Sequence, residues 1–337
     1  MKKDIWGFDL DVSKRNLYIR WDISLWCNYN CSYCFYSDHR RNVVVKQIKS
    51  KNILDIIRFK KHKNIFGHSF DNFSAEKWVQ KFKQIAKGRK LAIGITGGEP
   101  FLDKENFHYV LSKLIKMDEI DNIRIDTNGS FVVNNFKDLD CKKVYLNISY
   151  HPESTSIDKL ISKVKEIQNV GMNVLMINYV MTPQNKDNYE EVYKKFAQIG
   201  VAVNPGVYYD VKNPENEKNY VNWYAKYLNE FDIVNKCSLI DLQGKVNCKF
   251  PQIGLVISYT GDIYNPCFQD KKLNLFKHNI NMKKINNLLM NYSQKCPLKD
   301  CGCLQQYSFQ EGCTRNQKSL NVLKNYVEDA IILKGND

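Results

Sequence analysis

The sequence contains no apolar run long enough to cross a membrane, which takes about 18 to 20 residues. Its first stretch, "MKKDIWGFDLDVSKRN", follows two lysines with acidic and polar residues, unlike the apolar core of a secretory signal. It contains no motif typical of nucleic-acid binding, no internal repeat and no low-complexity tract. These absences exclude an integral membrane protein, make a nucleic-acid partner a poor expectation, and predict a cytoplasmic protein.

Acidic residues are scarce in one segment, residues 39–63, "HRRNVVVKQIKSKNILDIIRFKKHK". It holds nine Lys or Arg against one Asp, which is more than half of the formal net charge of +14. A basic segment is either a solvated surface or a site of attraction for an anion such as a phosphorylated small molecule. Both interpretations stay open.

Cysteine, in contrast, is abundant: the 337 residues include eleven. Disulfide-rich scaffolds are typically short, secreted chains, and neither property fits. Clustered cysteines in a reducing compartment more often hold metal, so we expect metal sites.

Short apolar runs alternate with amphipathic helical patterns from about residue 17 to 210. The runs are rich in Val, Ile and Tyr, and they predict six strands, at 17–26, 91–96, 123–126, 143–150, 173–181 and 201–209. Asn188 with Glu191 has the spacing of a capping box that would open the last of the helices between them. Strands separated by helices imply parallel crossovers, hence an α/β barrel or an open doubly wound sheet. In either fold, loops at the C-terminal ends of the strands form the active face.

This pattern divides the chain into parts. The list of expected parts is an N-terminal arm (1–16), a barrel (17–210) with a basic insertion at about 38–72, a polar linker (211–236), and a cysteine-rich domain with a closing helix (237–337). The insertion follows the first strand, so it is either a lid over the active face or a surface excursion. In the last part, "GLVISYTGDIYNPCF" predicts a β-hairpin that turns at Thr260-Gly261-Asp262.

Three cysteines, Cys27, Cys31 and Cys34, follow the first predicted strand in "WCNYNCSYCFY". A structural zinc site needs four ligands, and the nearest histidine, His39, lies in the basic segment. A four-iron cluster usually takes four thiolates as well. With three, one iron keeps an open position that a substrate or cofactor can occupy.

The spacing C-x3-C-x2-C, with the aromatic Tyr33 before the third cysteine, resembles the radical S-adenosylmethionine (radical SAM) superfamily. Three further features recur in the family order: "GGEP" at 97–100, "TNG" at 127–129 and "NISYHPE" at 147–153. The resemblance covers residues 17–210 and implies a partial (β/α)6 barrel. It also implies a [4Fe–4S] cluster whose open iron binds S-adenosylmethionine, reductive cleavage of this cofactor, and hydrogen abstraction by the 5′-deoxyadenosyl radical.

The same resemblance implies cofactor contacts. Glu99 and the backbone of Gly97 and Gly98 would hold the methionine ammonium, because glycines allow close approach and a carboxylate accepts from an ammonium. Tyr33 would lie against the adenine.

Asn128 and Ser149 are candidates for ribose contacts. A turn asparagine and a strand-end serine without a ligand remain equally good interpretations.

A second cysteine group resembles the auxiliary-cluster extensions called SPASM and twitch domains. Its members are Cys248, Cys267, Cys296, Cys301, Cys303 and Cys313. The spacing departs from the usual pattern: "CPLKDCGC" does not fit, and no cysteine follows Cys313. Six thiolates are too few for two fully ligated four-iron clusters, so we expect one auxiliary [4Fe–4S] cluster, with two incompletely ligated clusters as the alternative.

Two cysteines are left over. Cys141 precedes the fourth predicted strand, on the edge opposite the expected chemistry, and we interpret it as structural. Cys237 is a candidate hydrogen-atom donor to a substrate radical, with a core role as the alternative.

The sequence supports three hypotheses of function. The first is an enzyme that takes a hydrogen atom from a polar small molecule (a sugar, aminocyclitol or nucleotide, with an anionic group as one option), ending in dehydrogenation or epimerisation. The second is a maturase of ribosomally made peptides, and the third a cluster-bearing redox protein without turnover. "GGEP" and "TNG" count against the third, because an electron carrier needs no S-adenosylmethionine site. For the first two we expect a flavodoxin or ferredoxin as electron donor.

Overall fold

The computed structural model describes residues 17–34, 67–206, 247–248, 253–265, 268–289, 294–295 and 310–311. Six strands and five helices alternate through the first two of these ranges. The strands are β1 (Leu17–Ser24), β2 (Leu91–Gly97), β3 (Ile120–Thr127), β4 (Val144–Tyr150), β5 (Asn173–Val180) and β6 (Val203–Gly206). The helices are α3 (Ser69–Asn72), α4 (Ala75–Ala86), α5 (Lys104–Leu114), α6 (Ile157–Asn169) and α7 (Tyr189–Ala197).

Short 3-10 helices complete this part of the chain. They are η3 (Pro100–Leu102), η4 (Val133–Phe136), η5 (Cys141–Lys143) and η6 (Lys186–Asn188). Helix α7 begins after Asn188, as the sequence predicts, but the Asn188 side chain makes no capping hydrogen bond. The expected capping box is therefore wrong: Asn188 ends η6 in a near-helical conformation, with φ −88° and ψ 1°, instead of the extended one that a cap requires.

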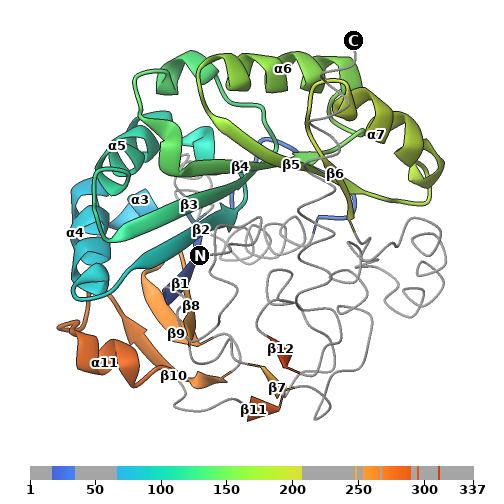
Figure 1. Cartoon of the computed structure of the whole chain (residues 1–337). Coiled ribbons are helices and arrows are strands. Elements are labelled where there is room, and N and C mark those ends of the chain that lie inside the picture. Colours follow the sequence, from blue (N-terminus) through green and yellow to red (C-terminus); the bar gives the residue numbers. More distant parts are fainter. Residues whose placement is uncertain are drawn as a thin grey trace, which may run out of the picture.

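The six strands are parallel and pair in sequence order, β1-β2-β3-β4-β5-β6. The sheet curves, and α4, α5, α6 and α7 cover its outer side (Figure 1). Every second strand residue faces these helices and joins the core; Ile19, Trp21 and Ile23 of β1 are all fully buried there. This arrangement confirms the partial (β/α)6 barrel.

Segments from late in the chain extend the same sheet. They are β8 (Gly254–Ile257), β9 (Asp262–Asn265) and β10 (Phe268–Asn274), and the short helix α11 (Met282–Asn286) comes after them in the chain. Strand β8 pairs parallel with β1, and β9 and β10 continue antiparallel, giving nine strands in the order β10-β9-β8-β1-β2-β3-β4-β5-β6. The predicted hairpin is confirmed as β8–β9, with Gly261 at φ +81° in its turn.

Aromatic packing fastens this extension to the barrel. The Phe276 ring stacks on Phe73 with centroids 3.6 Å apart and meets Trp78 of α4 edge-on at 4.8 Å. A separate small sheet consists of β7 (Asn247–Cys248), β11 (Gln294–Lys295) and β12 (Gln310–Glu311), in the order β11-β7-β12. Among the described residues, no helix is both long and apolar enough to span a membrane.

Candidate functional site

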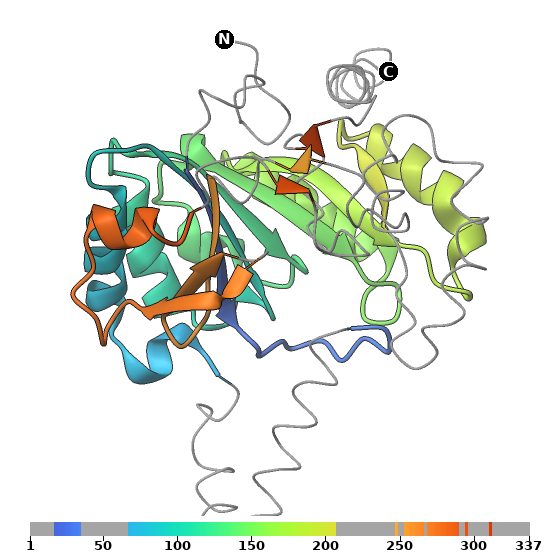
Figure 2. The same cartoon turned by 90° about the horizontal axis from the view of Figure 1, so that it is seen from below.

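The cysteine loop, residues 25–34, leaves the C-terminal end of β1 and crosses the edge at which the parallel strands end (Figure 2). Two backbone hydrogen bonds tie its start to the end of β2: Gly98 N–H donates to the Ser24 carbonyl (2.6 Å) and Glu99 N–H to the Trp26 carbonyl (2.7 Å). These bonds require close contact of two backbones, and only glycine permits it. A Cβ at Gly98 would lie 1.7 Å from the Trp26 oxygen, and Gly97 has φ +126°.

The loop that follows β3 holds the first cysteine. Asn128 Nδ2 donates to Asn28 Oδ1 (2.9 Å), and Asn28 Nδ2 donates to Ser130 Oγ (2.9 Å). The same Asn128 amide lies 3.6 Å from the Cys27 sulfur, which also accepts from the Tyr29 N–H at 3.4 Å. The "TNG" sequence therefore positions the loop around Cys27.

The turn that follows β4 holds the stretch from the second to the third cysteine. Ser32 donates to the Glu153 carboxylate from its N–H (2.9 Å) and its hydroxyl (2.6 Å). Tyr33 Oη and His151 Nδ1 are 2.8 Å apart. The cysteine loop thus contacts the ends of β2, β3 and β4.

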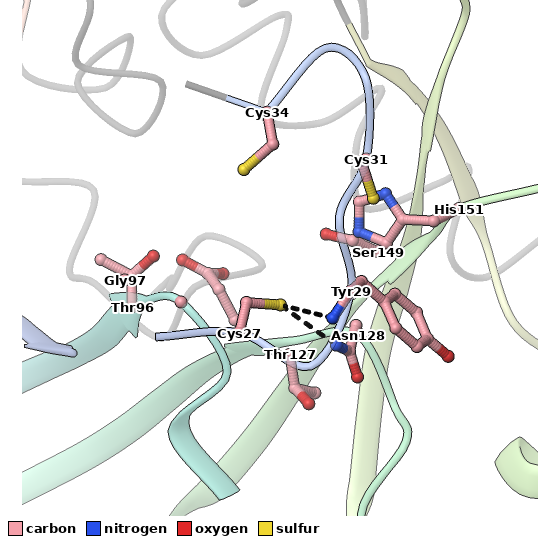
Figure 3. A pocket seen from close by; sticks show the side chains of 12 residues that line it. Cys27, Tyr29, Cys31, Cys34, Thr96, Gly97, Thr127, Asn128, Ser149 and His151 are labelled. Atoms are coloured by element: carbon pink, nitrogen blue, oxygen red, sulfur yellow. Dashed lines mark hydrogen bonds between the residues drawn. The ribbon is translucent and has the colours of Figure 1, made fainter. Parts of the chain in front are cut away.

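These loops enclose a pocket of about 160 Å³ (Figure 3). Its lining residues are Cys27, Tyr29, Cys31, Cys34, Thr96, Gly97, Gly98, Asp126, Thr127, Asn128, Ser149 and His151. The three predicted cluster cysteines therefore share one cavity with Gly97, Gly98, Asn128 and Ser149. Among the described residues, no three acidic, histidine or cysteine side chains are close enough together to hold a single metal ion.

The donor set fits a cluster better than a single ion. Each cysteine thiolate of a four-iron cluster binds a different iron, so the three cysteine sulfurs lie around the cluster and do not meet at one point. None of the three thiols is in a disulfide, and the N–H groups of Tyr29 and Asn128 at Cys27 are the kind of donors that tune a ligated sulfur. Gly97 and Gly98 line the same pocket beside these thiols.

Burial shifts the proton affinities around the pocket. It raises the pKa of the Cys31 thiol to about 11 and also raises the pKa of Tyr33. It lowers the pKa of His151 to about 4, so the imidazole is neutral near pH 7. Binding of metal by Cys31 therefore has to displace a tightly held thiol proton.

Glu99 lies behind the pocket wall, with only 1% of its surface exposed. Its carboxylate accepts from the Thr127 hydroxyl (2.7 Å), the Asn128 N–H (2.7 Å) and the Phe101 N–H (3.2 Å). Burial nevertheless raises its pKa to about 7. In the structure Glu99 joins the ends of β2 and β3, and its expected contact with the methionine ammonium stays a prediction.

Tyr33 is not part of the lining either. Its ring stacks against His151, with centroids 5.9 Å apart, and its predicted contact with adenine stays a prediction. The expectations for Cys237, Cys267, Cys296, Cys301, Cys303 and Cys313 lie outside the described residues, as do the basic segment 39–63 and all of the expected insertion except residues 67–72. Cys248 lies in β7.

Sequence reasoning missed several residues of the site. Asp126 and Thr96 line the pocket because they are strand-end residues on the inner side of the sheet, a signal available from the alternation of β3 and β2. His151 and Glu153 belong to the "HPE" that follows β4, but nothing in the sequence indicates their contacts with the cysteine loop.

Comparison with known proteins gives a family and a fold. The family model described as "Radical SAM superfamily" matches residues 21–196. No curated protein matches the chain.

Solved structures resemble the chain at low identity. Streptococcus suis SuiB matches with a TM-score of 0.50 and 17% identity over 79% of this chain and 64% of SuiB; its complex with S-adenosylmethionine gives a TM-score of 0.48 at the same identity and coverage. BtrN in complex with AdoMet and 2-DOIA gives a TM-score of 0.39 and 14% identity over 88% of this chain and 99% of BtrN. The chain thus spans slightly less than two thirds of SuiB, and these likenesses concern the fold.

The family uses a [4Fe–4S] cluster and S-adenosylmethionine, which agrees with three thiols outside any disulfide and a glycine-lined cavity at the C-terminal ends of parallel strands. The family model covers residues 21–196 of 337, more than half of the chain. The protein belongs to the radical SAM superfamily.

Proposed function

We propose that this radical SAM protein removes a hydrogen atom from a polar small molecule that binds against the inner face of the barrel sheet. The proposal covers sugars, aminocyclitols and nucleotides as substrates, and dehydrogenation or epimerisation as outcomes. The observation that carries it is the polar character of that inner face.

Parallel sheets in α/β proteins are usually apolar on both faces. Here each of the six barrel strands carries at least one polar residue among those that alternate with the core positions, although Ala92, Gly94, Met176 and Val180 in such positions are not polar. The polar residues include Tyr18, Arg20, Asp22, Thr96, Asn122, Arg124, Asp126, Asn147, Ser149, Asn178 and Asn204. Polar side chains on the inner face of a sheet lose contacts with water and contribute little packing energy. They are therefore expected mainly where a ligand binds.

The charges on this face are paired. Arg20 makes two hydrogen bonds to Asp22, at 3.0 and 2.9 Å, and Arg124 Nη2 lies 3.0 Å from Asp126 Oδ2. Asn147 Nδ2 donates to Asp126 Oδ1 at 2.8 Å. Because both arginines have a carboxylate partner, the face offers little attraction for an anion.

Asp126 connects this face to the cysteine pocket. It lines the pocket together with Thr96 and Ser149, while its partner Arg124 is buried beneath. A carboxylate in this position favours hydroxyl or amine donors on the part of the substrate that reacts. An anionic group elsewhere on the substrate would be attracted by the basic residues 39–63.

The cofactor chemistry is that of the family: cluster and S-adenosylmethionine together supply a 5′-deoxyadenosyl radical that can take a hydrogen atom from an unactivated C–H bond. In our proposal Cys27, Cys31 and Cys34 hold the cluster. Gly97, Gly98, Asn128 and Ser149 surround the S-adenosylmethionine, with Glu99 and Tyr33 as further candidates.

The remaining parts of the proposal concern electron supply and a second cluster. A flavodoxin or ferredoxin delivers the electron. One auxiliary [4Fe–4S] cluster is held by cysteines of the second group, Cys248 and Cys267 first among them, and Cys237 is a candidate hydrogen-atom donor.

The radical step is tested with protein reconstituted with iron and sulfide. With dithionite and S-adenosylmethionine it should form 5′-deoxyadenosine, and the triple variant Cys27→Ala, Cys31→Ala, Cys34→Ala should form none. Cys141→Ala, a buried cysteine beside β4, is the matched control and should keep the activity. Cofactor cleavage by the triple variant would disprove the cluster assignment.

The substrate class is tested by isotope transfer. Perdeuterated sugars, aminocyclitols, nucleosides and peptides are offered one at a time, and deuterium in 5′-deoxyadenosine is measured by mass spectrometry. We expect transfer from a hydroxyl- or amine-bearing small molecule. Transfer from peptides alone would favour the competing proposal, a maturase of a ribosomally made peptide.

A further inference from the structure

The turn that follows β4 contacts two consecutive residues of the cysteine loop, Ser32 and Tyr33. It is closed by hydrogen bonds from Ser154 N–H (2.9 Å) and Thr155 N–H (3.1 Å) to the His151 carbonyl. His151 hydrogen-bonds to Tyr33, and Glu153 accepts hydrogen bonds from Ser32. The stretch between the second and third cysteines is thus held residue by residue from one turn.

Glu153 makes the strongest of these contacts. Its two carboxylate oxygens accept separately, Oε2 from the Ser32 N–H and Oε1 from the Ser32 hydroxyl. Hydrogen bonds to an ionised acceptor are about twice as strong as neutral ones, and two of them determine orientation as well as distance. Ser32 in turn lies directly between Cys31 and the Tyr33–Cys34 pair, so fixing it restrains the backbone that carries both thiols.

The carboxylate also brings a negative charge to the edge of the cysteine pocket. The reduction potential of an iron–sulfur cluster depends on nearby charge, on hydrogen bonds and on solvent exposure. Added negative charge disfavours the uptake of an electron. Because Glu153 is exposed, water and salt screen this effect without abolishing it.

We infer that Glu153 is a positioning residue of the cluster site, which orients the Cys31–Cys34 stretch through Ser32 and lowers the reduction potential of the cluster held there. The inference rests on the proposed role of Cys27, Cys31 and Cys34 as cluster ligands. It assigns to the "HPE" sequence a role in controlling the cluster.

The test is a redox titration of the reconstituted protein, followed by electron paramagnetic resonance. Glu153→Gln removes the charge and keeps an acceptor oxygen. We expect the same iron content and a more positive potential, seen as an increase of about fivefold in the ratio of reduced to oxidised cluster at one applied potential. The increase should shrink when the salt concentration is raised from 20 mM to about 500 mM.

Glu166→Gln is the matched control. Glu166 lies late in α6, where it pairs with Lys163, toward the sheet edge opposite the cysteine loop, and the variant makes the same change of charge. Ser32→Ala separates the two roles, because it removes one hydrogen bond but no charge. We expect this variant to broaden the cluster spectrum and lower iron retention, with a smaller change of potential.

A normal cluster whose potential is the same in wild type, Glu153→Gln and Glu166→Gln would overturn this inference alone. A shift of equal size in Glu153→Gln and Glu166→Gln would overturn it too, since it would reflect net charge rather than position. Failure of the wild type to hold any cluster would overturn the proposed function as well, so the two failures are distinguishable.

Discussion

At the scale of single residues, Gly98 shows what a missing side chain makes possible. The end of β2 and the start of the cysteine loop touch backbone to backbone, and a Cβ at Gly98 would lie 1.7, 2.3 and 2.9 Å from three Trp26 backbone atoms. None of these atoms can turn away as a flexible side chain would. "GG" is therefore a packing requirement of the cysteine loop, whatever the glycines also do for a cofactor.

Gly98→Ala should accordingly displace the loop. We expect a loss of about 1 to 3 kcal/mol in the free energy of unfolding, the usual cost of overpacking, and poor incorporation of iron. Gly88→Ala is the control: Gly88 has φ +79° but nothing within 4 Å, so only backbone strain of about 1 kcal/mol applies. Urea unfolding and iron analysis measure both variants, and equal iron content in the two would contradict the packing argument.

Glu99 is a buried acid whose protonation is linked to stability. Its pKa is raised from 4.5 to about 7, so between these values the folded protein keeps a proton that the unfolded chain has released. The free energy of unfolding should therefore fall as the pH rises from about 4.5 to 7 and level off above it.

We expect the Glu99 carboxyl to lower the free energy of unfolding by up to about 3 kcal/mol between about pH 4.5 and 7. The variant Glu99→Gln should abolish this pH dependence. The introduced glutamine side chain should lower the free energy of unfolding somewhat at every pH. Its NH2 group would replace one carboxylate oxygen and would then face the backbone N–H of Asn128 or Phe101, so that two donors meet. Urea unfolding of cluster-free protein between pH 5 and 8 measures the slope. An unchanged slope in Glu99→Gln would show that Glu99 is ionised throughout, and Glu166→Gln should behave like wild type.

At the scale of elements, the late strands belong to the same sheet as the early ones. β8 pairs with β1 along Tyr18–Trp21, opposite β2, and Ile257 lies beside Trp21 with both side chains fully buried. Strand β1, which carries the cysteine loop, is therefore an interior strand with neighbours on both sides.

Ile257→Ala should for this reason destabilise the barrel itself. Truncation of a buried Ile typically costs about 2 to 5 kcal/mol. The change should move the whole unfolding transition, followed by the fluorescence of tryptophans such as Trp21 and Trp78, to lower urea concentration. Val132→Ala, at a side chain that is 58% exposed, should shift it by no more than about 0.5 kcal/mol. A barrel transition that Ile257→Ala leaves in place would mean that the extension unfolds separately.

The sequence predicts the barrel strands well, because Val, Ile, Leu or aromatic residues recur at every second position in most of them. The predicted strand at 91–96 is β2 (Leu91–Gly97), and 173–181 is β5 (Asn173–Val180). It does not predict that β8 lies beside β1, because nothing local specifies which edge a distant strand will join. The failed capping box at Asn188 has a similar cause: a 3-10 turn over Lys186–Asn188 already determines the backbone there.

In the candidate site, too, some features follow from a local motif and others depend on distant parts of the chain. A motif places Cys27, Cys31 and Cys34 in one cavity and brings Gly97, Gly98, Asn128 and Ser149 to it. Asp126 and Glu153 act through contacts with partners far along the chain, and a single sequence carries no record of such pairs.

At the scale of the whole molecule, the second cysteine group makes a prediction about metal content. Four irons belong to each [4Fe–4S] cluster, so reconstituted wild type should hold about eight irons and eight sulfides per chain. Cys248→Ala with Cys267→Ala should reduce this to about four and leave cleavage of S-adenosylmethionine measurable. Cys141→Ala should change neither. About four irons in the wild type would remove the auxiliary cluster.

The attachment of the cysteine loop also determines an order of events during maturation. Asn28 of the loop contacts Asn128, 100 positions away, and Ser32 contacts Glu153, 121 positions away. These hydrogen bonds cannot form before the barrel strands have paired. Strands β1 to β4 must first come together, and only then are the three thiols gathered around one cavity. Iron that arrives earlier meets three cysteines on a loose loop. We therefore expect the cluster proposed at these thiols to be accepted by a chain whose strands β1 to β4 have already come together.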